Sequence, residues 1–127
     1  MFLDTGVLID ILRYKKGTKE FDIIFKHIEN EELYISIFQT VEISNWALKN
    51  NISPAEPIQF IKNIVNILPL NEDICQNTVF IKNDLQKKGV KKFGLADGII
   101  LASARVIDQR LLTNNRNLKN INDAVVI

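Results

Sequence analysis

Short apolar runs alternate along the chain with longer segments in which apolar residues recur every three or four positions. The short runs have the composition of buried β-strands, and the longer segments have the spacing of amphipathic helices. The predicted strands are residues 1–4, 33–37, 67–70, 110–114 and 124–127. The predicted helices are residues 5–16, 18–32, 38–50, 53–66, 71–89 and 92–108.

Local signals support several of these boundaries. Gly17 separates the first two predicted helices, and Gly89 stops the fifth, because glycine readily adopts the conformation that ends a helix. Ser53 followed by Pro54 is typical of a helix start, with serine as the N-cap and proline in the first helical position. The helix over residues 92–108 is so apolar that we expect it to be buried on most sides.

The alternation of strands and helices predicts an α/β fold. Parallel neighbouring strands require crossover connections, and the crossover helices then cover both faces of the sheet. We therefore expect a single domain over residues 1–127, built as a three-layer sandwich with a central, mainly parallel sheet of about five short strands. The length of 127 residues suits one domain and is too short for two.

Composition excludes several classes of protein. The 46% of hydrophobic and 24% of charged residues are ordinary for a globular domain, and no apolar run approaches the roughly 18 residues of a membrane span. The N-terminus has no secretory signal pattern, so we expect a cytoplasmic protein without membrane attachment. His27 and Cys75 are the only residues of their kinds, which excludes a Cys/His zinc site, a Ser-His-Asp triad and a disulfide framework.

Charge is balanced overall and uneven locally. The net charge of +1 lacks the basic excess of a protein that coats nucleic acid. Residues 13–19 and 82–92 are basic, whereas residues 29–32 and 71–73 are acidic. Such runs are typical of solvated helix ends, and they hold phosphates only where a reactive centre lies nearby.

Carboxylates are the main remaining source of chemistry. The triplet Asp4-Thr5-Gly6 resembles the catalytic triplet of aspartic proteases, but the helical periodicity after Asp4 contradicts their nearly all-β fold. Asp4 instead ends a strand, Glu42 lies early in a helix, and Asp97 begins the most apolar helix. Each acid alone has a structural explanation, as a loop acceptor, a solvated residue or a partner of the helix dipole. Together they are predicted to converge at one sheet edge, where a hard cation such as Mg²⁺ or Mn²⁺ relieves their repulsion.

At these positions the sequence resembles the PIN-domain family, in particular the VapC-like toxins of prokaryotic toxin–antitoxin pairs. The resemblance covers nearly the whole chain through four segments, "FLDTGVLID", "ISIFQTVE", "LADGIILASA" and "LLTNNRNLKNI". It implies a metal-dependent endoribonuclease that uses Mg²⁺ or Mn²⁺. Asp4, Glu42 and Asp97 match its metal ligands, and Asn115 matches a fourth catalytic position. Hydroxyl residues expected to orient the ligands are Thr5, Ser36 and Thr113.

The chain also departs from the pattern of this family. Asn115 and Asn117 stand where acids are usual or frequent, so affinity for a second ion should be reduced. Gly6 and Gln39 replace hydroxyl residues, and we expect this to remove hydrogen bonds that orient the ligands. The haloacid-dehalogenase pattern is a poorer match, since it needs another Asp where Gly6 stands.

The resemblance further implies an RNA substrate and an antitoxin partner. In the predicted mechanism, Asp4 and Asp97 hold the ion and Glu42 binds it directly or through water. Outside the acids, Arg13, Lys15, Lys16, Lys91 and Lys92 are candidates for holding phosphates. The apolar segments 21–28 and 57–65 predict a homodimer, although ordinary core packing explains them equally well. The alternative function is a weakly active or inactive module that binds an antitoxin or a second copy of itself.

Overall fold

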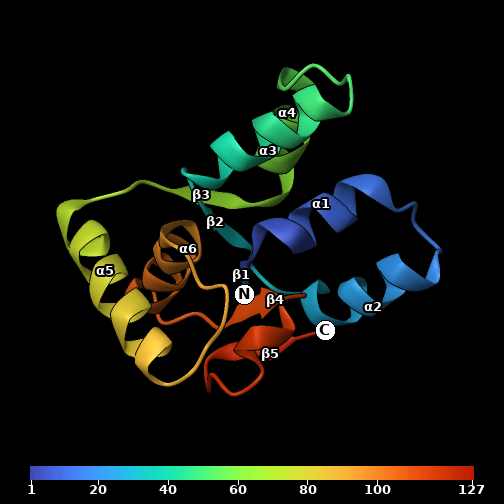
Figure 1. The fold of residues 1–127 in the computed structure, drawn as a ribbon. Helices are drawn as coiled ribbons and strands as arrows, with labels where there is room; N and C mark the ends of the chain where they lie inside the picture. Colours follow the sequence, from blue (N-terminus) through green and yellow to red (C-terminus); the bar gives the residue numbers. More distant parts are fainter.

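The computed structural model describes all residues from Met1 to Ile127 and contains one sheet of five strands (Figure 1). The strand order is β3-β2-β1-β4-β5, and every neighbouring pair is parallel. Each strand has only two or three residues: β1 (Phe2–Leu3), β2 (Tyr34–Ser36), β3 (Asn66–Leu68), β4 (Leu111–Thr113) and β5 (Ala124–Val126). The predicted parallel α/β architecture is confirmed.

Six α-helices and one short 3₁₀-helix connect the strands. Their bounds are α1 (Thr5–Arg13), α2 (Lys19–Ile28), α3 (Gln39–Lys49), α4 (Ala55–Ile64), α5 (Glu72–Lys87), α6 (Leu95–Val106) and η1 (Arg116–Leu118). None of them has both the length and the apolar character needed to cross a bilayer.

The sheet separates two apolar cores, which makes the domain three-layered. Alternate residues of a strand point to opposite faces, and accordingly Leu3 packs in one core and Phe2 in the other. The first core also contains buried residues of α1, α2, α3 and α4, and the second contains residues of α5, α6 and η1. Figure 1 shows α5 and α6 together on their side of the sheet.

Several predicted boundaries were wrong. The second helix ends at Ile28 rather than at residue 32. The first helix ends at Arg13 rather than at residue 16, and the chain is already extended at Tyr14. Ser53 does not cap α4, whose N-cap is Pro54 without a side-chain hydrogen bond. Asn66 was predicted to be helical but begins β3, where its backbone N–H donates to Leu33 O at 2.7 Å.

Other predicted features are confirmed. Gly89 has a φ of +86° just after α5, the left-handed conformation that glycine allows at low cost. The helix α6 is the most deeply buried, with six buried residues in its twelve. The 3₁₀-helix η1 was not predicted, because three residues are too few to show a helical period.

Candidate active site

The strand order places the candidate site at the centre of the sheet. The chain leaves β1 toward β2 on one side and reaches β4 on the other, so the order reverses between β1 and β4. In open parallel sheets, ligands bind outside the carboxyl ends of the strands at such a reversal. Asp4 follows β1 directly and Thr113 is the last residue of β4, so both lie at this position.

Asp4 is the N-cap of α1, and donors from α1 and β4 fix its carboxylate. Its Oδ1 accepts the Thr5 backbone N–H at 2.8 Å, and its Oδ2 accepts the hydroxyl of the buried Thr113 at 2.5 Å. Thr113 Oγ1 in turn accepts the backbone N–H of Asn115 at 3.0 Å. The orientation of Asp4 therefore depends on β4 as well as on its own helix.

Glu42 reaches the same edge from the first turn of α3. Its Oε1 accepts the hydroxyl of Thr5 at 2.7 Å, while no protein group donates to Oε2. Because Thr5 also donates its backbone N–H to Asp4, this one residue joins two of the predicted acids. The predicted roles of Thr5 and Thr113 beside the acids agree with these contacts.

Asp97 lies in the first turn of α6, where its Oδ2 accepts the backbone N–H of Gly94 at 2.9 Å. This bond satisfies a backbone donor at the helix start, and the negative charge also suits the helix dipole. The structural explanation of Asp97 therefore holds, and it leaves Oδ1 without a protein donor.

Electrostatics link the three acids. Burial raises the pKa of Asp4, hydrogen bonds from Thr113 and Thr5 oppose this, and the charge of Asp97 raises the pKa further. Burial likewise raises the pKa of Glu42, the Thr5 hydroxyl opposes the rise, and the charges of Asp4 and Asp97 add to it. The ionised carboxylates thus destabilise one another at this edge, and a cation would relieve the repulsion.

The donors fit a hard divalent cation in chemical type, since carboxylate oxygens are the ligands that Mg²⁺ and Mn²⁺ prefer. Their arrangement is less complete. No group of three or more His, Cys, Asp or Glu side chains is placed to hold one ion together. Asp4, Glu42 and Asp97 are therefore not assembled into one such group, and Glu42, predicted to bind the ion directly or through water, is bonded to Thr5.

Gln39 is a site residue whose role was predicted wrongly. We expected it to remove orienting hydrogen bonds, but its fully buried side chain makes three. Its Nε2 donates to Leu3 O at 2.8 Å and to Thr5 Oγ1 at 3.2 Å, and its Oε1 accepts Ser36 N–H at 2.8 Å. Gln39 therefore supports the hydroxyl that holds Glu42.

The Gln39 amide also replaces a bond of the sheet. Tyr34 N–H donates to Met1 O, so the next bond of this parallel ladder would join Ser36 N–H to Leu3 O. The Gln39 amide lies between those two groups and bonds to both. This accounts for the single paired position between β1 and β2, Phe2 with Tyr34.

Ser36 and Asn115 make local bonds rather than contacts with the acids. Ser36 Oγ accepts the backbone N–H of Phe38 at 3.2 Å, at the start of α3. Asn115 Oδ1 accepts the backbone N–H of Asn117 at 3.0 Å and so caps η1. A carbonyl oxygen has a second lone pair, and the catalytic role of Asn115 stays a prediction.

The absence of a side chain at Gly6 also has a structural cause. A Cβ at this position would collide with the side-chain amide of Asn114. That amide donates to Asp10 Oδ2 at 3.1 Å. Asn114 therefore occupies the space that a hydroxyl side chain at position 6 would need.

The predicted phosphate-binding residues divide into two groups. The helix α1 begins beside Asp4 and is about 13 Å long for its nine residues, so Arg13 lies at its far end and Lys15 and Lys16 follow it. The structure therefore does not bring these three to the acids. Lys91 and Lys92 precede α6, whose first turn carries Asp97, and so lie on the side of the acidic edge.

Comparisons with known proteins agree with this geometry. The structure is similar to three solved structures, each over 98–99% of this chain and 95–96% of the other. They are a toxin–antitoxin complex from Klebsiella pneumoniae (TM-score 0.75, 21% identity), VapBC2 from Rickettsia felis bound to a DNA fragment from its promoter (0.76, 17%) and VapBC-1 from nontypeable Haemophilus influenzae (0.69, 24%). No curated protein sequence gives a significant match. The PIN domain model matches residues 1–124, and the chain therefore belongs to the PIN-domain family.

Proposed function

We propose that this protein is a divalent-metal-dependent endoribonuclease and the VapC-like toxin of a type II toxin–antitoxin pair. The observation that carries the proposal is the placement of the acids at the carboxyl edge of the sheet, where Thr5 is hydrogen-bonded to both Asp4 and Glu42 and the charge of Asp97 acts on both acids. Membership of the PIN-domain family and likeness to structures of toxin–antitoxin complexes support it. We propose that it acts on RNA in the cytoplasm.

The residues of this chain have distinct roles in the proposed reaction. Asp4 and Asp97 would hold the Mg²⁺ or Mn²⁺ ion, and Glu42 would bind it through water while its Oε1 stays bonded to Thr5. The bound ion supplies a water of lowered pKa and stabilises charge on the phosphate. Thr113 and Thr5 keep the Asp4 carboxylate turned toward the edge. The Oε2 of Glu42, which accepts no protein hydrogen bond, would be available to water.

A cleavage assay tests the proposal. Labelled RNA is incubated with the protein and Mg²⁺ or Mn²⁺, beside Asp4→Asn and Asp97→Asn variants and a control with chelator. We expect the unaltered protein to cleave the RNA. The cleavage rate of each variant should be at least about a hundredfold lower, since electrostatic groups at reacting centres contribute roughly this much. RNA that stays intact at high protein concentration with either metal would refute the nuclease.

A non-catalytic module is the second candidate. It is favoured by the incomplete ligand set and by Asn115, whose carbonyl oxygen is bonded within its own turn. In that case the fold acts only through protein contacts. Intact RNA in the cleavage assay, together with a tight complex with the antitoxin, would support this candidate over the enzyme.

An apolar groove between α1, α2 and α4 supports an antitoxin partner. Its volume is about 460 Å³, and Phe25 and Phe60 on its walls are 43% and 47% exposed. A groove of this kind suits the apolar face of a helix. We propose that the antitoxin lays such a helix here. Co-expression with the product of an adjacent reading frame should give a complex that Phe25→Ser with Phe60→Ser disrupts.

A second apolar surface suits a homodimer. Phe80 on α5 is 72% exposed and Val106 on α6 is 53% exposed, and both line a hollow of about 310 Å³. This surface lies on the other side of the sheet from the groove, so one copy can bind an antitoxin and a second copy together. Light scattering should detect a dimer in the unaltered protein and a monomer in Phe80→Ser.

A further inference from the structure

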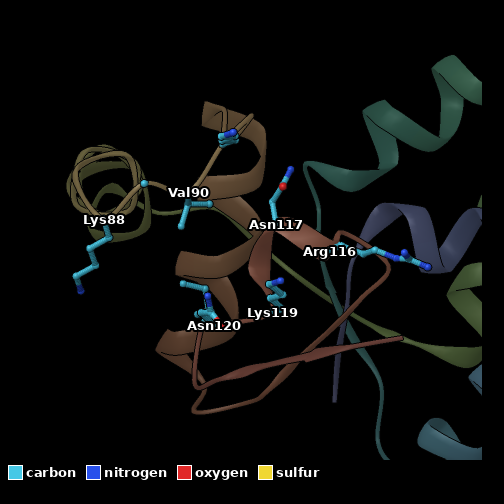
Figure 2. A pocket seen from close by; sticks show the side chains of 9 residues that line it. Lys88, Val90, Arg116, Asn117, Lys119 and Asn120 are labelled. Carbon is cyan, nitrogen blue, oxygen red and sulfur yellow. The ribbon is translucent and has the colours of Figure 1, made fainter.

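The largest cavity of the molecule is lined by cations and has no acid. It has a volume of about 540 Å³ and lies between the end of α5 with its following loop and the segment that begins with η1 (Figure 2). Four cations and two amides supply its polar side chains, namely Lys88, Lys91, Arg116, Lys119, Asn117 and Asn120. A chain with a net charge of only +1 thus concentrates positive charge in one hollow.

Most of these cations have no partner in the protein. The only salt bridges are Lys88 with Asp84 and Arg105 with Asp123, so Lys91, Arg116 and Lys119 are unpaired. Figure 2 shows Lys88 and Arg116 pointing away from each other, at opposite ends of the cavity. The cations are thus spread along the cavity, and an anion with several charged groups spaced along it would neutralise them.

The cavity is joined to the acidic edge by a short stretch of chain. Thr113 donates to Asp4 and accepts from Asn115, and Asn115 then caps η1 by accepting from Asn117. Arg116 follows Thr113 by three residues, so their Cα atoms are at most about 11 Å apart. A ligand in the cavity can therefore extend to the reacting centre of the proposed nuclease.

The chemistry of the lining selects the ligand. Only Val90 and Ile121 are apolar among the lining residues, so a protein segment would find few anchors for its apolar side chains. Cations and amides are instead suited to phosphate oxygens. A flexible single strand can enter a hollow between two loops, whereas the phosphates of a duplex lie on a stiff convex cylinder.

We propose that this basic cavity binds the phosphodiester backbone of single-stranded RNA beside the acidic edge. The inference rests on the proposed nuclease function for its substrate class. It assigns Lys91, Arg116 and Lys119 to the strand that flanks the reacting phosphate, and it gives no such role to the lysines at the far end of α1.

A binding experiment in chelator tests the cavity without any cleavage. A fluorescein-labelled oligouridylate of about a dozen nucleotides is titrated with the protein at several salt concentrations, and binding is read by anisotropy. The cavity variant combines Lys91→Gln, Arg116→Gln and Lys119→Gln. The matched control combines Lys19→Gln, Lys26→Gln and Lys62→Gln, which remove the same charge from exposed positions on α2 and α4. Melting temperatures check that both variants are folded.

The expected effect follows from counterion release. Each phosphate contact to a single strand contributes about 0.7 to the slope of log K against log salt concentration, so loss of three contacts reduces the slope by about 2. At about 0.1 M salt this corresponds to roughly a 10- to 100-fold loss of affinity in the cavity variant. The control variant should keep most of the affinity and slope of the unaltered protein.

Other outcomes would overturn the inference. Equal losses in the two triple variants would show that only overall charge matters, and an unchanged cavity variant would remove the site altogether. Tighter binding of duplex DNA of equal length, lost in the cavity variant, would assign the cavity to DNA. Because no metal is present, binding is read separately from cleavage. If the unaltered protein cuts RNA and the cavity variant binds RNA with unchanged affinity, the cavity proposal is wrong while the proposed nuclease function stands.

Discussion

Replacing Gln39 by leucine tests whether its amide holds β1 and β2 together at the candidate site. Leucine is similar in size but cannot bond to Leu3 O or Ser36 N–H, and both residues are fully buried. An unpaired buried backbone group costs about 1–3 kcal/mol, so two groups cost about 2–6 kcal/mol. Burying an apolar side chain in place of the amide offsets roughly 1–2 kcal/mol. We therefore expect Gln39→Leu to lower the free energy of unfolding by about 1–4 kcal/mol.

Urea denaturation followed by circular dichroism measures this loss. For a slope of about 2 kcal/mol per molar urea, the midpoint should fall by about 0.5–2 M. Gln59→Leu is the matched control, because Gln59 is exposed on α4 and surface changes usually stay within about 0.5 kcal/mol. Amide hydrogen exchange of Ser36 should also become faster in Gln39→Leu and stay unchanged in the control.

An unchanged midpoint together with slow exchange at Ser36 would refute the reasoning. Such a result would mean that β1 and β2 close up and form the direct bond from Ser36 N–H to Leu3 O. The amide of Gln39 would then be a replaceable spacer. It would not be needed to hold the two strands at the candidate site.

Three further predictions concern the acids and the helix packing. The raised pKa values of Asp4 and Glu42 mean that the folded protein holds their protons more tightly than the unfolded chain does. In chelator, the stability of the protein should therefore fall as pH rises from the ordinary carboxylate range through the raised pKa values. Thermal melts from pH 3 to 8 should show this fall, and the Asp4→Asn variant should show a smaller fall and melt at a higher temperature at neutral pH. Thr113→Val removes the donor to Asp4 and should destabilise the protein by about 1–2 kcal/mol in urea. Because the pKa of Asp4 then rises further, the loss of stability with pH should extend to higher pH than in the unaltered protein. Gly98→Ala should lower the free energy of unfolding in urea by about 1–2 kcal/mol, although alanine has a better helix propensity than glycine. The reason is that the new Cβ would lie 3.0 Å from the backbone oxygen of Thr78. A more stable variant would contradict this close packing of α5 and α6.

The fold was predictable because its signals are local. Apolar runs of strand length and helices of regular period stand in strict alternation, and this fixes a parallel sheet. The errors fall where tertiary contacts override the local pattern. Asn66 continues a helical period but is drawn into β3 by its bond to Leu33 O, and Ser53 has a cap composition that the local turn does not use.

The acids of the site were predictable from their places at strand ends and helix starts, whereas the support around them was not. Gln39 acts by reaching two strands that lie far apart in the sequence, and no spacing rule indicates such a bridge. The distance of Lys15 and Lys16 from the acids could have been inferred. A helix that begins at the carboxyl edge must carry its last residues away from that edge.

The pairing of distant segments also affects when the site forms. Asp4 and Thr113, which share a hydrogen bond, are 109 positions apart. The two-residue strand β1 has few contacts of its own until β2 and β4 lie beside it, and such non-local contacts form late in folding. During synthesis Asp4 thus has no hydroxyl partner until Thr113 has been made and has left the ribosome. An unfinished chain would accordingly lack the assembled candidate site.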